Sequence, residues 1–175
     1  MAPSQPLFLG NQEMVIDGKL RVGIPERFMK ALRVICPDEA NCIGVWPSPD
    51  RSDKLMPAPL YREEIEKARR LDIRSEKGRI IRTLYSAHAE LLPLDAQNRI
   101  KLSKQICGMC KLSGAVIVVG SFDYMQIFDL ATWQEYEERG MSELSDAEDE
   151  VSRKEAEQRP VKFVIPVGQS GPEKV

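Results

Sequence analysis

A pattern of ten residues occurs twice in this chain, and the repeat restricts the folds that the chain can adopt. The first copy is V-I-D-G-K-L-R-V-G-I at 15–24, and the second is P-L-D-A-Q-N-R-I-K-L at 93–102. In each copy three residues separate an aspartate from an arginine, and a short alternating strand follows. Pro25 suits a first helical position after the first copy, and Ser103 suits an N-cap after the second. The repeat predicts two halves packed about a pseudo-twofold axis, each with an arginine in a turn.

The residues after each copy extend the repeat with looser spacing. We expect helices around 26–32 and 104–109, and we equate the apolar strand at 42–46 with the one at 125–128. Asp129 is placed to cap a helix that carries Trp133. The predicted division is a first half at 7–56, a helical connector at 57–89, a second half at 90–139 and an acidic tail at 140–175. The connector reads as one helix or two, with a break near Lys77.

Composition indicates a compact soluble protein without an export signal. A chain of 175 residues with 42% hydrophobic residues can bury one sizeable core. No apolar run approaches the ~20 residues needed to cross a bilayer, and the N-terminus lacks the basic start of a signal peptide. We therefore expect a cytoplasmic protein with reduced cysteines.

The net charge of −2 conceals an uneven distribution. Residues 140–175 hold eight acidic and five basic side chains, so residues 1–139 carry +1. Phosphate binding depends on where cations lie rather than on their total. Lys19 and Arg21, with Arg99 and Lys101, are candidates for one shared basic face. Acids interleave with the connector's many cations, which is typical of a solvated, salt-bridged helix.

The order and spacing of these motifs resemble the MraZ family over residues 7–138. The segments that carry the resemblance are F-L-G-N-Q-E-M-V-I-D-G-K-L-R-V-G-I-P-E-R-F, A-H-A-E-L-L-P-L-D-A-Q-N-R-I-K-L and V-V-G-S-F-D-Y-M-Q-I-F-D-L-A-T-W-Q-E-Y. The resemblance implies an α+β fold of two fused swapped-hairpin, β-barrel-type units like those of AbrB and SpoVT, with pseudo-twofold symmetry and flanking helices. It implies a bacterial transcriptional regulator, nucleoid-associated and assembled into rings. Such a regulator binds direct repeats of double-stranded DNA upstream of the division and cell-wall operon.

The two turn arginines have two interpretations. Ion pairs of Asp17 with Arg21 and of Asp95 with Arg99 could fix the turns, because aspartate favours turns and arginine binds carboxylates in bidentate fashion. Alternatively, the guanidinium groups contact phosphates or guanine edges in the major groove. The resemblance implies the DNA contact foremost for Arg21 and more weakly for Arg99. Asp17 and Asp95 are assigned to turn structure.

One departure from the family pattern concerns the residue before each arginine. The family usually has glycine there, where a turn can require a positive φ. This chain has Leu20 and Asn98 instead. Asparagine tolerates a positive φ but leucine does so poorly, so we expect Gly18 to take over that role in the first turn.

Other candidate sites are weaker. Cys107 and Cys110 have metal or redox spacing, but we expect ordinary thiols and no metal, because the remaining cysteines, Cys36 and Cys42, lie in the other half. His88 has no nucleophile as partner, and no glycine-rich phosphate loop is present. We therefore expect no cofactor, no small-molecule substrate and no enzymatic activity. The large aromatic residues are predicted to lie in the core or at subunit contacts: Phe28, Trp46, Phe122, Phe128 and Trp133.

The C-terminal segment is rich in charged and small residues. Residues 142–160 hold few large apolar side chains, so we expect them to fray or to be disordered. The run V-K-F-V-I-P-V at 161–167 is apolar enough to dock as an edge strand. The alternative function, suggested by Leu20 and a pI of 5.6, is an oligomeric protein-interaction scaffold that has lost DNA binding.

Overall fold

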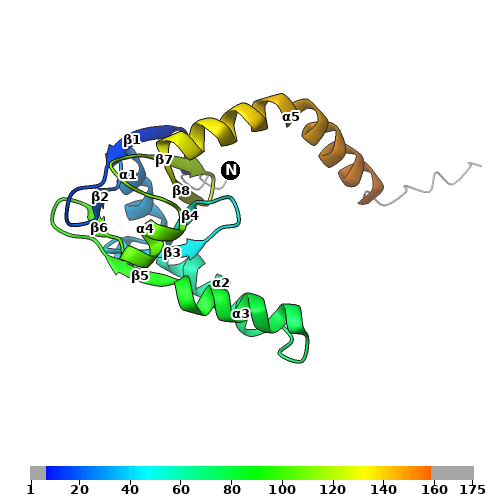
Figure 1. Ribbon diagram of the computed structural model, residues 1–175, viewed down its shortest axis with the longest axis horizontal. Coiled ribbons are helices and arrows are strands. Elements are labelled where there is room, and N and C mark those ends of the chain that lie inside the picture. Colours follow the sequence, from blue (N-terminus) through cyan, green and yellow to red (C-terminus); the bar gives the residue numbers. More distant parts are fainter. Residues whose placement is uncertain (1–6, 159–175) are drawn as a thin grey trace, which may run out of the picture. The chain divides into compact units, whose positions relative to one another are not determined.

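The repeated segments form corresponding parts of a mixed α+β structure, seen here in a computed structural model (Figure 1). The structure describes residues 7–158, and the side chains of residues 7–144. The chain divides into two compact units, Met1–Tyr136 and Glu137–Val175. The strands are β1 (Asn11–Val15), β2 (Arg21–Gly23), β3 (Cys42–Pro47), β4 (Asp53–Pro57), β5 (Glu90–Pro93), β6 (Arg99–Lys101), β7 (Ala115–Ser121) and β8 (Tyr124–Asp129). The helices are α1 (Glu26–Ile35), η1 (Pro37–Glu39), α2 (Ala58–Arg69), α3 (Glu76–His88), α4 (Lys104–Met109) and α5 (Leu130–Gln158).

The strands form a six-stranded antiparallel sheet and a separate two-stranded ribbon. The sheet order is β1-β7-β8-β4-β3-β5, and the ribbon joins β2 to β6. The strand before each repeated turn pairs with a strand of the other half, because β1 lies beside β7 and β5 lies beside β3. The predicted barrel-type closure is not found among the described strands, since β1 and β5 remain open edges. The three-residue strands β2 and β6 do not pair with the six-stranded sheet and form the separate ribbon.

The equivalence of residues 42–46 with 125–128 is wrong. By order and pairing, β3 takes the place of β7, and β4 takes the place of β8. No strand was expected at Asp53–Pro57, because the segment D-K-L-M-P is short and ends in a proline at the start of the predicted connector.

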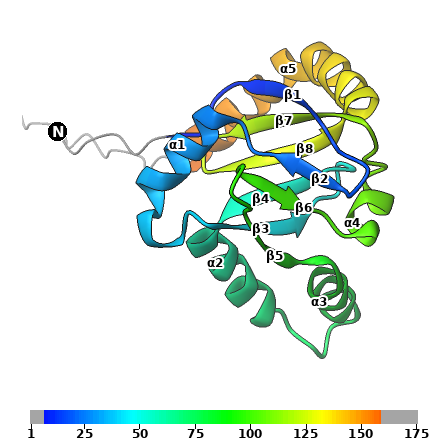
Figure 2. The same ribbon diagram turned by 90° about the vertical axis from the view of Figure 1, so that its left-hand side faces the viewer.

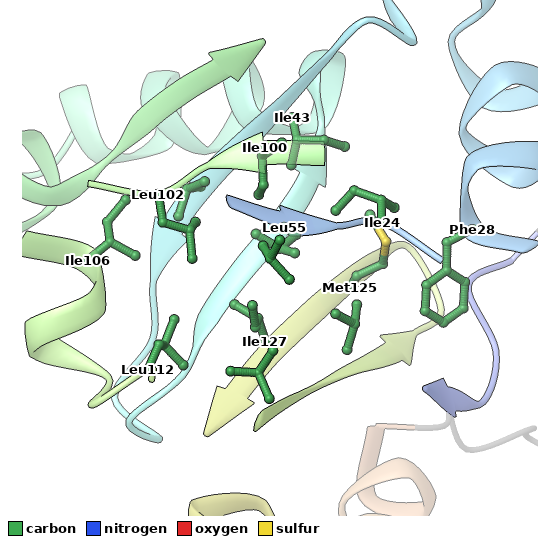
Figure 3. Close-up of a cluster of buried hydrophobic side chains, with 14 of the residues drawn as sticks. Ile24, Phe28, Ile43, Leu55, Ile100, Leu102, Ile106, Leu112, Met125 and Ile127 are labelled. Carbon is green, nitrogen blue, oxygen red and sulfur yellow. The ribbon is translucent and has the colours of Figure 1, made fainter. Parts of the chain in front are cut away.

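The ribbon packs across one face of the sheet, and the main core lies between them (Figure 2). Val22 and Ile100, at the centre of the ribbon, are fully buried. Figure 3 shows Ile24, Ile100 and Leu102 pointing toward Leu55, Met125 and Ile127 of the sheet. Alternation within each ribbon strand thus sends one apolar side chain into the core and leaves its neighbours at the surface.

The helix starts follow local sequence signals. Ser103 accepts a hydrogen bond from the Ile106 amide at 3.2 Å, and Asp129 accepts one from the Ala131 amide at 3.1 Å, as predicted for both caps. Pro25 is the N-cap of α1 rather than its first helical residue. The connector is two helices, α2 and α3, and its break lies at residues 70–75 rather than at Lys77.

The C-terminal helix extends further than expected. Residues 142–158 were predicted to fray, but α5 continues through Gln158. This stretch contains neither glycine nor proline, and it holds five Glu and two Ala, which favour a helix. The predicted edge strand at 161–167 lies outside the described residues.

Candidate nucleic-acid interface

The two repeated turns have the same hydrogen-bond pattern. Asp17 Oδ1 accepts from the amides of Lys19 and Arg21, both at 2.9 Å, and the Leu20 amide donates to the Asp17 carbonyl at 2.9 Å. In the second turn, Asp95 Oδ1 accepts from the corresponding amides at 2.9 and 3.0 Å. Each aspartate therefore closes its turn through backbone groups, as assigned.

The second carboxylate oxygen of each aspartate holds the turn arginine. Arg21 donates from Nε and Nη2 to Asp17 Oδ2, at 2.7 and 2.6 Å. Arg99 makes the same pair of contacts with Asp95 Oδ2, at 2.8 and 2.7 Å. Both predicted ion pairs are present. They do not exclude a ligand contact, because Nη1 of each guanidinium makes no hydrogen bond to a described residue, and the two side chains remain 32% and 28% exposed.

The ion pairs keep both aspartates charged at neutral pH. The hydrogen bond from the Arg21 side chain, aided by the Arg21 amide, lowers the pKa of Asp17 from 3.8 to about 2. The corresponding bond from Arg99 lowers the pKa of Asp95. A carboxylate that accepts several hydrogen bonds is stabilised in its ionised form. Each turn therefore presents an oriented guanidinium beside a carboxylate that is ionised at neutral pH.

The ribbon brings three of the four predicted cations onto one face. Arg21 lies opposite Lys101 in the β2–β6 register, and Gly23 lies opposite Arg99. Since Val22 and Ile100 point into the core, these neighbours point outward. Lys101 and the fourth cation, Lys19 in the first turn, are exposed. We call Lys19, Arg21, Arg99 and Lys101 the ribbon face.

The residue before each arginine has a left-handed backbone. Leu20 has a φ of 60° and Asn98 a φ of 57°, whereas Gly18 has no positive φ. The expectation that Gly18 would take over the strained position is therefore wrong. The Leu20 and Asn98 amides donate equivalent backbone hydrogen bonds, to the Asp17 and Asp95 carbonyls, and the Leu20 side chain packs against the main core. The Asn98 side chain instead accepts a hydrogen bond at 3.3 Å from Arg33 of α1.

Three cations of the connector form exposed ion pairs with acidic side chains. Arg62 pairs with Glu39, Lys67 with Glu64 at 2.6 Å, and Arg69 with Glu66 at 2.7 Å. All three cations are more than half exposed. This is the solvated, salt-bridged pattern that the interleaved charges predicted.

The cysteine pair lies beside a buried acid that the sequence analysis missed. Cys107 and Cys110 are buried, and Cys110 Sγ donates to Asp53 Oδ2 at 3.1 Å. Burial raises the pKa of both thiols, so they are poor nucleophiles. Asp53 is 1% exposed, its Oδ1 has no described partner, and burial raises its pKa to about 6. No sequence signal distinguishes this acid from a surface one.

The described residues contain no metal-binding constellation or membrane span. No group of three or more histidine, cysteine, aspartate or glutamate side chains in this part of the chain is arranged to hold a metal. His88 Nδ1 lies 3.0 Å from the Gln105 amide nitrogen. No described helix is both long and apolar enough to cross a bilayer.

Comparison of the sequence with known proteins identifies the family of this chain. The chain is 37% identical over 148 residues to the transcriptional regulator MraZ of Mycobacterium sp. (strain KMS), covering 84% of this chain and 98% of that relative. The chain belongs to the MraZ family. The MraZ family model, described as antitoxin-like, matches residues 86–158, which include the second turn.

Other MraZ relatives support the same assignment. Identity to the transcriptional regulator MraZ of Mycolicibacterium smegmatis is 36% over 152 residues, covering 84% of this chain and 98% of that protein. Identity to that of Mycobacterium avium (strain 104) is 30% over 145 residues, covering 82% and 96%. Both matches span most of each protein, so membership of the MraZ family applies to the chain as a whole.

Proposed function

We propose that this protein is a sequence-specific DNA-binding transcriptional regulator that contacts double-stranded DNA through the ribbon face. The single observation that carries the proposal is the pairing of β2 with β6, because it gathers arginine and lysine from both repeats on one exposed ribbon. A two-stranded ribbon fits the major groove of B-DNA. The relatives' name, transcriptional regulator, supports the same role.

Within this face the residues have different roles. Arg21 and Arg99, oriented by their aspartates, suit bidentate contacts to a phosphate or a guanine edge. Lys19 and Lys101 are flexible point charges that suit phosphates. Asp17 and Asp95 serve the turn structure and direct the arginines.

We also infer that the halves at 7–56 and 90–139 form two fused swapped-hairpin units about a pseudo-twofold axis, joined by the connector at 57–89. The sheet order supports this, because exchanging β1 with β5, β7 with β3 and β8 with β4 leaves it unchanged. The matched turns support it independently. We further propose that several copies assemble into a ring. The ring would bind direct repeats of DNA upstream of the division and cell-wall operon, which would place the protein on the nucleoid.

Selection of bound sequences from a random pool of duplexes tests this function directly. We expect enrichment of a short repeated sequence, and affinity for it should fall steeply as salt increases, because each neutralised phosphate releases a counterion. Lys101→Ala should reduce the salt dependence, whereas the matched connector variant Lys67→Ala should not. No binding even at low salt would favour the alternative, a protein-interaction scaffold.

A further inference from the structure

Phe122 combines an unfavourable backbone conformation with an exposed aromatic ring. It lies at the tip of the β7–β8 hairpin with a φ of 59°, in the region where glycine is favoured and a bulky residue is rare. Two backbone hydrogen bonds with Phe8, at 2.8 and 3.1 Å, fix it there. Its side chain is 62% exposed, although other aromatics of this chain, such as Phe28 and Phe128, are buried. Packing within the described part of the chain does not explain the phenylalanine.

An apolar hollow lies beside the other hairpin of the sheet. Its volume is about 470 Å³, within the range of sites that enclose a ligand or an anchoring side chain. It is formed by the tip of β3–β4 and by residues of α3 and α4. Leu84 and Met109 in its wall are 51% and 39% exposed. The lining residues are Pro47, Ser48, Pro49, Ile81, Leu84, Tyr85, His88 and Met109.

The topology places the Phe122 side chain and the apolar hollow at opposite ends of the sheet. Strands β4 and β8 are antiparallel neighbours, so the hairpin tips that precede them point in opposite directions. The two tips also differ in chemistry. Arg51, with a φ of 55°, is the left-handed residue of the β3–β4 tip, and it pairs with Glu135 at 3.0 Å. Within the described residues, Phe122 therefore projects from one end of the sheet, and the apolar hollow lies near the other end.

We propose that Phe122 of one copy inserts into the hollow of a second copy, so that the chain assembles head to tail. A second copy is the fitting occupant, because the same chain carries both complementary surfaces at opposite ends. A contact between two different surfaces repeats from copy to copy and closes into a ring when the rotation allows. This inference rests on the proposed assembly of several copies, and it names the surfaces that join them. Burial of the Phe122 side chain in this contact also explains why phenylalanine is present where glycine would suit the backbone.

Replacement of Phe122 by glycine separates assembly from folding. Glycine fits the backbone, so the monomer should remain folded and become no less stable toward heat. Its association, measured by sedimentation without DNA over a range of concentrations, should weaken by at least ~30-fold, as for an anchoring aromatic residue. Asn98→Gly is the matched control, because it places glycine at another left-handed residue, with a φ of 57°, away from both the Phe122 tip and the hollow, and should leave association unaltered.

A mixing experiment tests the direction of the contact. Leu84→Asp alters the wall of the hollow at an exposed helix position and should also weaken association. When the two variants are mixed, they should form heterodimers. The Phe122→Gly chain retains an intact hollow, and the Leu84→Asp chain retains the Phe122 side chain that fits it. Dimers should not extend further, since the remaining surfaces are both altered.

Three results would overturn the interface. They are wild-type association of Phe122→Gly, no association in the mixture, and a wild-type protein that stays monomeric. If Phe122→Gly assembles normally and still binds repeated DNA, the interface is wrong and the proposed function stands. If the wild type assembles through Phe122 but binds no selected DNA, the interface stands and the DNA-binding function is wrong.

Discussion

At the scale of single residues, one aspartate in each turn closes the backbone and orients an arginine. Asp17 uses Oδ1 for amides and Oδ2 for Arg21, and Asp95 repeats this division with Arg99. The ion pair and the DNA contact, which the sequence presented as alternatives, are geometrically compatible. The aspartate occupies Nε and Nη2, which leaves Nη1 and the outer side of the guanidinium for a ligand.

Replacement of Arg21 by alanine should abolish specific DNA binding and leave the oligomer intact. One base or phosphate contact contributes on the order of 1–3 kcal/mol, and in an assembly the loss recurs at each engaged subunit. Arg99→Ala should have a smaller effect, and Arg69→Ala, which removes a solvated connector cation, should have none. DNA titration and sedimentation measure the two properties. Unfolding of Arg21→Ala would assign the arginine to turn structure alone, and normal binding would show that the interface lies elsewhere.

The buried acid predicts a pH dependence of stability. Burial raises the pKa of Asp53 from 3.8 to about 6, so the folded state favours the protonated form. The resulting contribution to the free energy of unfolding is fully present below pH 3.8 and is lost as the pH rises through about 6. The total loss is on the order of 3 kcal/mol. Asp53→Asn keeps an acceptor for Cys110 and should remove this loss. Chemical denaturation between pH 4 and pH 7 checks it, and an identical pH profile in both proteins would contradict it.

At the scale of elements, short-range contacts decide where helices begin. Ser75 accepts from the Gly78 amide at 3.4 Å at the start of α3, and the loop from α2 folds closely over this first turn. A Cβ on Gly78 would lie 2.1 Å from the Asp72 carbonyl oxygen. Gly78 therefore permits the close approach of the loop and does not mark the break between the helices.

Alanine substitutions at two helical glycines should have opposite effects. Gly78→Ala should destabilise the fold by about 1–3 kcal/mol, because the new methyl group overlaps a backbone oxygen. Gly108→Ala in α4 meets nothing within 4 Å and should stabilise by about 0.5–1 kcal/mol, as expected for an unobstructed helix position. Urea denaturation of both variants measures the difference. A stable Gly78→Ala variant would show that the loop moves aside at little cost.

At the scale of the whole molecule, a single ribbon face offers few cations for a polyanion. The four cations of one ribbon face can neutralise only a few phosphates, so one copy should hold DNA weakly. Several joined copies make each added contact intramolecular, which raises affinity by roughly 10²–10⁴. Because one copy makes few phosphate contacts, strong DNA binding should depend on the proposed assembly.

The DNA target should consist of direct repeats spaced near one helical turn, ~10 bp, so that each box presents the same face. A single box should bind poorly, and inserting about half a turn between boxes should remove most of the gain. A full-turn insertion should cost less. Affinities for one, two and three boxes with varied spacers measure this dependence. Equal affinity for one box and three would show that a single copy carries recognition.

Short-range sequence patterns were sufficient to predict the two turns and two helix caps. The repeated D-x-x-x-R pattern located both turns, because the aspartate contacts lie within four residues. Ser103 and Asp129 predicted their helix caps for the same reason, since a cap depends on residues two or three positions away. The four ribbon-face cations were also named from spacing alone, and their binding role stays a prediction.

Which distant segments pair, and in which register, depends on the folded structure as a whole. The pairing of Arg21 with Lys101 joins strands far apart in sequence, and no local preference encodes that register. The positive φ lies at Leu20, the position equivalent to Asn98 in the second turn, so the preference of glycine for that conformation pointed wrongly to Gly18. Asp53 is buried because β4 lies inside the sheet, between β8 and β3. Burial and strand partners are properties of the folded whole, and they set the charge, the strain and the exposed faces of this molecule.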